Sequence, residues 1–272
     1  MPDHQFSYAL NSSTIRPVPL LEKIRIAGAA GFAGIELWHD DIEAHLKQGG
    51  QLHDIVVALG DQNLRVPTTI HMKGWFESAG EEHTANMDAC KWKMEQAEAV
   101  GAAHIIAGPP RESADRVRGA ANYRELLEIG HEIGVKPAME FLGFVEDINT
   151  IEDALEIITI AGHPDGTIVL DPFHIFRGGG SLESIAPLKP EQIAVCHFND
   201  APAQPPREQQ ADRDRVYPGD GMLDLPRMIA LLKQIGYDGW LSLELFNEKL
   251  WQQDPLEVAR RGLEKMRAVV EA

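Results

Sequence analysis

The stretch "TIVLDPFHIFRGGG" (residues 167–180) joins an apolar strand to two polar residues. Thr167–Leu170 suit a buried β-strand, and Asp171 follows them directly, with His174 three residues later. Taken alone, this pattern indicates an aspartate that caps a helix and a histidine on the surface. Other strands of the chain also end on polar side chains, and that repetition predicts a barrel with a site at one end.

Short apolar runs alternate with helical patterns along the whole chain, and several helical segments reach a glycine just before the next strand. Glycine at this position is typical of helix C-caps. Eight strand–helix units predict an α/β fold, a (β/α)8 TIM barrel, with residues 1–272 as a single domain. An open doubly wound sheet is the alternative, but no Gly-x-Gly-x-x-Gly turn follows an early strand. The predicted strands cover residues 6–10, 34–38, 68–72, 104–108, 137–142, 167–171, 194–198 and 241–246.

The ends of four consecutive strands carry side chains that could bind a metal. Side chains alternate in and out along a barrel strand, and barrel active sites form at the C-terminal strand ends. This alternation points four side chains toward the barrel axis: Glu140, Asp171, His197 and Glu244. Three converging carboxylates would repel one another and lose hydration unless a cation joined them. The sequence therefore predicts a divalent metal, and oxygen ligands with one imidazole suit Mn²⁺, Mg²⁺ or Co²⁺.

Further polar and aromatic residues fall near the same strand ends. Trp38 is predicted to form an apolar wall of a substrate pocket, and His71, expected to point inward with Thr69, is predicted to line it. Glu36 shares the face of Trp38, and we expect it to bond neighbouring strands inside the barrel. Residues 200–220, rich in Pro, Gln and charge, are predicted to form a long loop on the top face.

Composition narrows the classes of partner and the compartment. The 25 Lys and Arg against 42 Asp and Glu give a formal charge of −17, which repels nucleic acid and anionic lipid at long range. No apolar run reaches the ~20 residues of a membrane helix. The N-terminus "MPDHQFSYAL" lacks a signal-peptide pattern, and two cysteines are too few for a disulfide framework. We therefore expect a cytoplasmic protein with a small-molecule substrate and without nucleic-acid or membrane partners.

Six motifs in barrel order resemble the xylose isomerase-like TIM barrel superfamily, in its branch of sugar phosphate isomerases and epimerases. They are "GIELW", "AMEFLGF", "VLDPFHIFRGG", "VCHFNDAP", "RVYPGDGMLDL" and "GYDGWLSLELFN". The resemblance covers nearly the whole chain and is specific for the superfamily, but not for a substrate.

The resemblance implies that the four inward side chains bind one divalent metal, with Mn²⁺ preferred and Mg²⁺, Co²⁺ or Zn²⁺ as alternatives. It implies that Glu140 and Glu244 also act as the acid–base pair. His174 matches the family's substrate-binding histidine, three residues after the metal aspartate. An arginine before the "PGDG" turn would hold a substrate oxygen, a position that Arg215 fits best, with Arg213 as the alternative.

The function that this resemblance implies is a metal-dependent isomerase or 3-epimerase of a ketose or keto-polyol, acting through a metal-bound enediolate. The main alternative is a lyase that dehydrates a cyclic keto-polyol, such as an inosose or 3-dehydroshikimate. Both reactions begin with removal of a proton next to a ketone, and they differ in the fate of the enolate. Relatives are often dimers or tetramers, so the sequence leaves a homo-oligomer open.

Two further functions are compatible with such a barrel. An abasic-site endonuclease of this superfamily needs extra metal ligands, including an Asp-x-His pair, whereas residues 212–215 read "DRDR". The net negative charge also disfavours binding to a DNA backbone. A barrel without catalysis, acting as a sugar-binding or partner protein, is disfavoured because all four metal-capable side chains are present.

Overall fold

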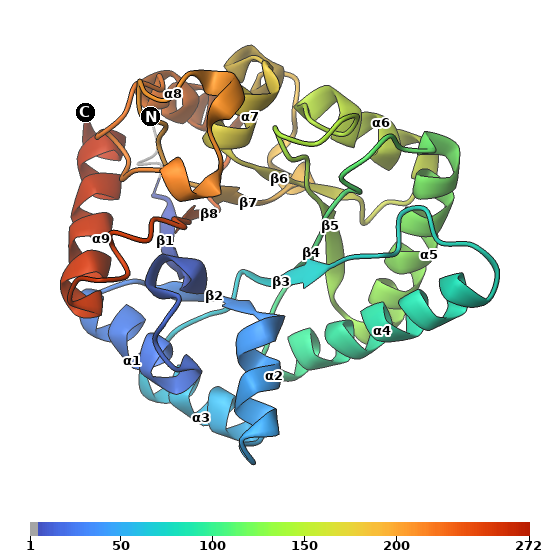
Figure 1. Cartoon of the computed structure of the whole chain (residues 1–272), viewed down its shortest axis with the longest axis horizontal. Coiled ribbons are helices and arrows are strands. Elements are labelled where there is room, and N and C mark those ends of the chain that lie inside the picture. Colours follow the sequence, from blue (N-terminus) through green and yellow to red (C-terminus); the bar gives the residue numbers. More distant parts are fainter. Residues whose placement is uncertain (1–4) are drawn as a thin grey trace.

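Eight parallel strands close into a barrel in which each strand pairs with its neighbours in chain order. The computed structural model describes residues 5–272, and Figure 1 looks into the ring of strands, which the helices surround. The (β/α)8 barrel predicted from the sequence is therefore confirmed. That the whole range 1–272 is one domain stays a prediction, because residues 1–4 lie outside the described part. The strands are β1 Ser7–Asn11, β2 Gly34–Trp38, β3 Thr68–Met72, β4 His104–Ala107, β5 Lys136–Met139, β6 Thr167–Leu170, β7 Ile193–His197 and β8 Trp240–Leu243.

The helices cover the outside of the barrel, and many end where glycine was predicted to stop them. Gly31 and Gly236 have φ angles of 94° and 82°, a left-handed backbone that favours glycine. The α-helices are α1 Leu20–Ala30, α2 His39–Lys47, α3 Leu52–Asp61, α4 Gly80–Ala99, α5 Arg116–Ile133, α6 Ile151–Ala161, α7 Pro172–Gly178, α8 Leu225–Ile235 and α9 Pro255–Glu271. Short 3₁₀ turns are η1 Ser12–Ile15, η2 Leu182–Ile185, η3 Pro190–Gln192, η4 Arg207–Gln209 and η5 Asp212–Asp214.

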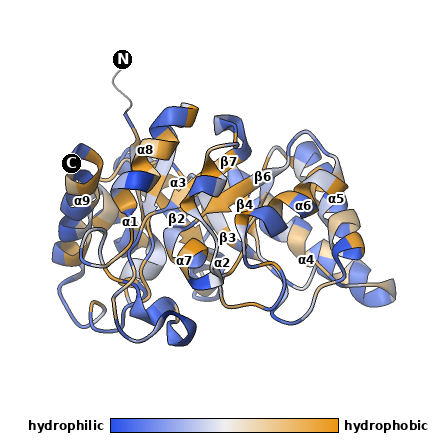
Figure 2. Ribbon diagram, turned by 90° about the horizontal axis from the view of Figure 1, so that it is seen from above, coloured by the Kyte–Doolittle hydropathy of each residue, from blue (hydrophilic) through white to orange (hydrophobic). Residues whose placement is uncertain are grey.

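Two hydrophobic clusters follow from the alternation of side chains along the strands. The larger cluster lies between strands and helices, and a smaller one, which includes Ala138, Val169 and Val195, lies inside the barrel. In Figure 2 the strand arrows near β6 and β7 are hydrophobic, whereas the surrounding helices alternate between hydrophobic and hydrophilic residues. Glu140, Asp171 and His197 each lie two residues after one of these three inner side chains, so they also point toward the barrel axis. A slip of one residue would turn them outward, and burial of the apolar set opposes it.

Strand β3 departs from the expected alternation. Thr68 and Ile70 point into the barrel, since Thr68 bonds Glu36 and Ile70 joins the inner cluster. Thr69 instead bonds His39 of α2, on the outside. The prediction that His71 shares an inward face with Thr69 is therefore wrong. The pairing of β3 with β4 shifts register between Thr69 and Met72, which breaks simple alternation there.

The predicted long loop between β7 and α8 is confirmed as residues 198–224. Asp200, at its start, accepts backbone N–H bonds from Gly219, Gly221 and Leu223, at 3.0, 3.1 and 3.0 Å. These bonds hold the "PGDG" turn against the end of β7, and so they fix where the preceding residues of the loop lie. No helix within residues 5–272 combines the length and apolar character needed to cross a membrane.

Candidate metal centre

Four consecutive strand ends bring the predicted metal ligands to one end of the barrel. Glu140, Asp171 and Glu244 directly follow β5, β6 and β8, and His197 is the last residue of β7. His197 pairs in register with Ser242 of β8, two residues before Glu244, so the two inward side chains are neighbours. All four are buried, with Glu140 the most exposed at 9%.

The side-chain atoms of these residues converge on Nδ1 of His197. This nitrogen lies 3.0 Å from Oε2 of Glu244, 3.6 Å from Oδ2 of Asp171 and 3.8 Å from Oε1 of Glu140. Ligand atoms of Asp171, His197 and Glu244 all lie within 4.8 Å of one another. The tight group is therefore these three residues, and Glu140 lies at its edge.

The donor set fits a divalent cation. Nδ1 of His197 is buried and has no hydrogen-bond partner of good geometry among the described residues, although carboxylate oxygens surround it. A buried ring nitrogen left in this way carries a large desolvation cost unless something binds it. One imidazole and several carboxylate oxygens form a mixed set that suits Mn²⁺, Co²⁺ or Zn²⁺.

Asp171 combines the helix-cap role with a place in the site. Its Oδ1 accepts the backbone N–H groups of Phe173 and His174, at 2.8 and 3.2 Å, and so begins α7. Its Oδ2 faces His197 and Arg215. The helix cap expected from this stretch alone is thus correct, and it orients the second oxygen toward the cluster. The surface position expected for His174 is wrong, because that residue is 2% exposed.

The buried charges shift one another's protonation. Burial, aided by Glu244 and Asp171, raises the pKa of Glu140 to about 8, although His197 opposes the rise. Burial alone would raise the pKa of Asp171, but Arg215 and nearby histidines outweigh it and lower that pKa well below its usual range. Burial likewise lowers the pKa of His197, yet Glu244 and other carboxylates bring it well above its ordinary value. The site is therefore rich in negative charge that a cation would offset.

Arg215 reaches this cluster from the β7–α8 loop and is almost completely buried. Its Nη1 donates to Oδ2 of Asp171 at 2.8 Å and to Oε2 of Glu244 at 2.7 Å. Its Nη2 donates to Oδ1 of Asp212 at 2.6 Å and lies 3.0 Å from Nε2 of His174. Of the two candidate arginines, Arg215 is thus in the site, whereas Arg213 is exposed.

His174 stands beside the cluster and away from the tight group. Its Nδ1 accepts the backbone N–H of Gly143 at 3.2 Å, and its ring meets Phe144 edge-on at 5.3 Å. Burial lowers its pKa, with Asp171 opposing and Arg215 adding to the fall. A neutral, fixed imidazole at this position can exchange hydrogen bonds with a substrate hydroxyl.

Trp38 and His71 form an aromatic wall together with Phe246. The Trp38 ring packs edge-on against His71 at 5.6 Å and against Phe246 at 5.7 Å. Burial, with Lys93 adding to it, lowers the pKa of His71 to about 4. The wall is therefore uncharged near neutral pH, while Arg16 lies over the Trp38 ring at 5.6 Å.

Two asparagines that the sequence analysis did not select contact the cluster. Nδ2 of Asn199 lies 3.2 Å from each oxygen of Asp171, and Nδ2 of Asn11 donates to Glu244 at 3.0 Å. Asn11 is the last residue of β1, so it follows the same rule of a polar strand end. The first strand was predicted to end at residue 10, one position too early, so Asn11 was not recognised as a polar strand end.

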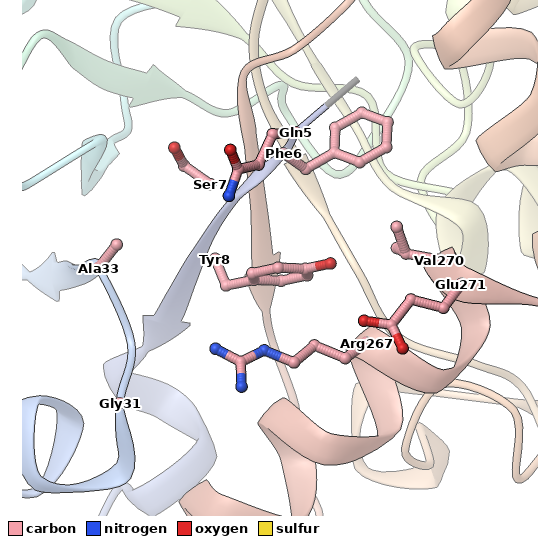
Figure 3. A pocket seen from close by; sticks show the side chains of 9 residues that line it. All are labelled: Gln5, Phe6, Ser7, Tyr8, Gly31, Ala33, Arg267, Val270 and Glu271. Carbon is pink, nitrogen blue, oxygen red and sulfur yellow. The ribbon is translucent and has the colours of Figure 1, made fainter. Parts of the chain in front are cut away.

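A cavity of about 620 Å³ lies at the opposite end of the barrel. Its lining includes Tyr8, near the start of β1, with Arg267 and Glu271 of α9 (Figure 3). The guanidinium of Arg267 lies over the Tyr8 ring at 5.7 Å. The predicted ligands end their strands at the other face, so this cavity is separate from the candidate site.

Fold and site together define a class: a (β/α)8 barrel with a candidate divalent-metal centre at the C-terminal ends of its strands. The sequence model of the family described as "Xylose isomerase-like TIM barrel" matches residues 24–269. The chain belongs to this family, as its motifs predicted.

Named relatives and a solved structure are similar to most of the chain. An inosose isomerase of Bacillus subtilis (strain 168) is 29% identical over 206 residues, which are 72% of this chain and 74% of that protein. A 3-dehydroshikimate dehydratase of Pseudomonas aeruginosa is 27% identical over 84% of this chain, a match that spans only 36% of the dehydratase. The crystal structure of the IolI protein with a zinc atom superposes with a TM-score of 0.90, covers 98% of each chain and is 23% identical.

Proposed function

We propose that this protein is a metal-dependent isomerase or epimerase of a keto-polyol or ketose. The observation that carries the proposal is the convergence of Asp171, His197 and Glu244 around a buried Nδ1 that lacks a hydrogen-bond partner among the described residues. The similarity to inosose isomerases favours a cyclic keto-polyol over a linear ketose as the substrate. It also supports an enzyme rather than a barrel that only binds a sugar.

A divalent metal would be held by Asp171, His197 and Glu244, with Glu140 as the fourth ligand at the edge of the group. When bound, it would polarise a ketone oxygen and stabilise the negative charge that develops there. We propose Mn²⁺ as the metal, since three carboxylates outnumber one imidazole. Zn²⁺ is the first alternative, because the IolI structure contains a zinc atom.

The two glutamates are proposed to move the proton. Glu244 accepts hydrogen bonds from Asn11 and Arg215, which stabilise its carboxylate, so it suits the base that removes the proton next to the ketone. Glu140, which lies at the edge of the group with its nearest charged partner 3.8 Å away, suits the acid that returns one. Proton loss from one carbon gives an enediolate, and protonation of the neighbouring carbon completes an isomerisation.

The surrounding residues are proposed to bind the substrate. Arg215 and His174, whose Nη2 and Nε2 atoms lie 3.0 Å apart, would contact hydroxyl or ketone oxygens of the substrate. Trp38 and His71 offer an apolar, uncharged surface on which the carbon face of a ring can pack. Arg215 lies over the Phe246 ring at 5.5 Å, so the charged and apolar groups adjoin, and together they would fix which face of the substrate meets the glutamates.

The proposal includes the cellular setting. We infer a cytoplasmic protein, because its two cysteines, Cys90 and Cys196, are both free and buried. A small-molecule substrate, no nucleic-acid partner and an open homo-oligomeric state complete the proposal.

A dehydratase is the second candidate, because the dehydratase relative matches a larger share of this chain than the isomerase does. Loss of a β-hydroxyl needs a proton donor at the leaving oxygen. Burial lowers the pKa of both His174 and His71, which favours their neutral forms. We propose Glu140 as the acid for the elimination as well, so the two functions would use the same residues.

Solvent exchange tests the proposal and separates the two functions. Inososes, ketoses and 3-dehydroshikimate are incubated in D₂O with the Mn²⁺-loaded protein, the metal is removed, and proton NMR is recorded. We expect loss of the signal of a proton next to a ketone, with an isomerised product. A dehydrated enone would establish the lyase instead. No exchange with any of these compounds, from protein that holds metal, would refute both.

A further inference from the structure

Asn11 uses every hydrogen-bonding position of its amide. Its Oδ1 accepts the backbone N–H of Ser13 at 3.1 Å and Nε1–H of Trp38 at 2.9 Å. Both partners can only donate, so the orientation of the amide is fixed. Its Nδ2 therefore donates to Oε2 of Glu36 and to Oε1 of Glu244, each at 3.0 Å.

Glu36 is completely buried at the centre of these contacts, and Asn11 is its register partner on β1. Its Oε2 accepts from Asn11 and from the hydroxyl of Ser242. Its Oε1 accepts from the hydroxyl of Thr68 and contacts Nε2 of His197 at 3.4 Å. An ionised carboxylate has about four acceptor positions, so these four neighbours fill it.

This arrangement determines which atoms face the metal site. If Nε2 of His197 carries its proton toward Glu36, Nδ1 keeps its lone pair, and Nδ1 is the atom 3.0 Å from Oε2 of Glu244. Asn11 holds Oε1 of Glu244 in the same way, which leaves Oε2 directed at the cluster. Nδ1 of His197 and Oε2 of Glu244 therefore face the site because the other nitrogen and the other oxygen of these side chains contact Glu36 and Asn11.

We propose that Glu36 and Asn11 are positioning residues of the metal centre, which orient His197 and Glu244 and fix the His197 tautomer that binds metal. The inference rests on the proposed function, because it requires that this cluster holds a divalent cation. Outer carboxylates that fix a metal-bound histidine typically change metal affinity by about 10–100-fold when they are replaced.

Glu36→Gln discriminates this role from a structural one. The amide –NH₂ must face either Asn11, which can offer only another donor, or Nε2 of His197. In the second case Nε2 becomes an acceptor, and the ring proton moves to Nδ1, where it blocks the metal. Either arrangement weakens metal binding although the shape of the side chain is kept.

The experiment measures the dissociation constants of Mn²⁺ and Co²⁺ without substrate, together with the visible spectrum of bound Co²⁺. Ser242→Ala is the matched control, because it removes one hydroxyl from Glu36 and keeps the carboxylate. We expect Glu36→Gln to bind metal about 10–100-fold more weakly, with an altered Co²⁺ spectrum. Ser242→Ala should bind metal as the wild type does, even where its unfolding temperature falls.

The outcomes separate this inference from the proposed function. Wild-type protein that binds no metal would refute the metal centre and this inference with it. If the wild type and Glu36→Gln bind metal equally tightly, the positioning role is overturned, but the metal centre is not. If Glu36→Gln does not fold, NMR of ¹⁵N-histidine-labelled wild type with Zn²⁺ decides. A proton on Nε2 of His197 supports the inference, and one on Nδ1 overturns it.

Discussion

At the scale of single residues, Glu140 and Glu244 have the same chemistry but different neighbours. Glu244 accepts hydrogen bonds from Asn11 and from Arg215, both of which stabilise a carboxylate. Glu140 approaches a partner only at 3.8 Å from Nδ1 of His197, and burial raises its pKa to about 8. Two carboxyl groups whose environments differ in this way are suited to the separate roles of base and acid.

Glu140→Gln and Glu244→Gln should each lower kcat by about 10²–10⁴-fold, because an amide keeps the shape of the carboxyl but transfers no proton. Turnover is measured at saturating metal, with circular dichroism to establish that both variants fold. Glu146→Gln, on the loop after Glu140, is the control and should keep wild-type turnover. Wild-type kcat in either of the first two variants would remove that residue from the acid–base pair.

Arg215→Ala should raise KM more than it changes kcat or metal affinity. The guanidinium is proposed to donate to a substrate oxygen, and a hydrogen bond that involves a charged group contributes about 1.5–3 kcal/mol, on the order of 10–100-fold in KM. Arg213→Ala is the matched control on the same loop, and its exposed side chain should leave KM unchanged. The opposite pattern would transfer the substrate role to Arg213.

At the scale of secondary-structure elements, the sequence predicted which side chains point inward at the ends of β5, β6 and β7, but not which side chains of β3 do so. Alternation along β5, β6 and β7 placed Glu140, Asp171 and His197 correctly, because burial on both faces of a strand fixes its register. The same rule failed at Thr69, where β3 and β4 shift register. Such a shift depends on pairing between strands, which no local pattern in one strand records.

The buried link between α2 and its neighbours should make stability depend on pH. His39 of α2 bonds Gln96 of α4 at 3.0 Å and Thr69 of β3 at 3.1 Å. Burial lowers its pKa from 6.5 to about 4, with Gln96 opposing the fall. As the pH falls, His39 is protonated in the unfolded chain before it is protonated in the folded protein. The contribution of neutral His39 to the free energy of unfolding is therefore complete above pH 6.5 and is lost as the pH falls toward 4.

Urea unfolding at several pH values measures this effect. The contribution of His39 is on the order of 3 kcal/mol over the whole window, from a pKa that lies about 2.5 pH units below its ordinary value. His39→Gln should reduce the fall in unfolding free energy between pH 6.5 and pH 4, while His71 and His104 supply the remaining dependence. Equal slopes for the wild type and this variant would contradict a neutral buried His39.

At the scale of the whole molecule, the sequence predicted the barrel because eight local patterns add up to one closed sheet. It did not predict which distant residues support the ligands. Asn11 lies 233 positions from Glu244 in the chain, and Glu36 lies 161 positions from His197. These contacts exist only after the barrel closes β1 onto β8, and therefore they require the three-dimensional structure.

Closure of the barrel also couples the metal site to global unfolding. The candidate ligands come from β5, β6, β7 and β8, so an unfolded chain cannot present them together. A cation that binds only the folded state stabilises it by about 2.7 kcal/mol when its concentration is 100 times its dissociation constant. Mn²⁺, Mg²⁺, Co²⁺ and Zn²⁺ should therefore each raise the thermal unfolding temperature, in the order of their affinities and with the logarithm of concentration over dissociation constant.

Thermal unfolding of chelator-treated protein, titrated with each metal in turn, ranks the cations without any substrate. Asp171→Asn serves as the comparison, since it keeps a side chain that can cap α7 but removes a charge from the cluster. The wild type should show concentration-dependent stabilisation that this variant largely loses. Equal stabilisation of both proteins would place the bound metal elsewhere on a surface with many carboxylates. Tighter binding of Zn²⁺ than of Mn²⁺ would not by itself displace Mn²⁺ as the proposed metal, because sites of nitrogen and oxygen ligands generally follow that order of affinity.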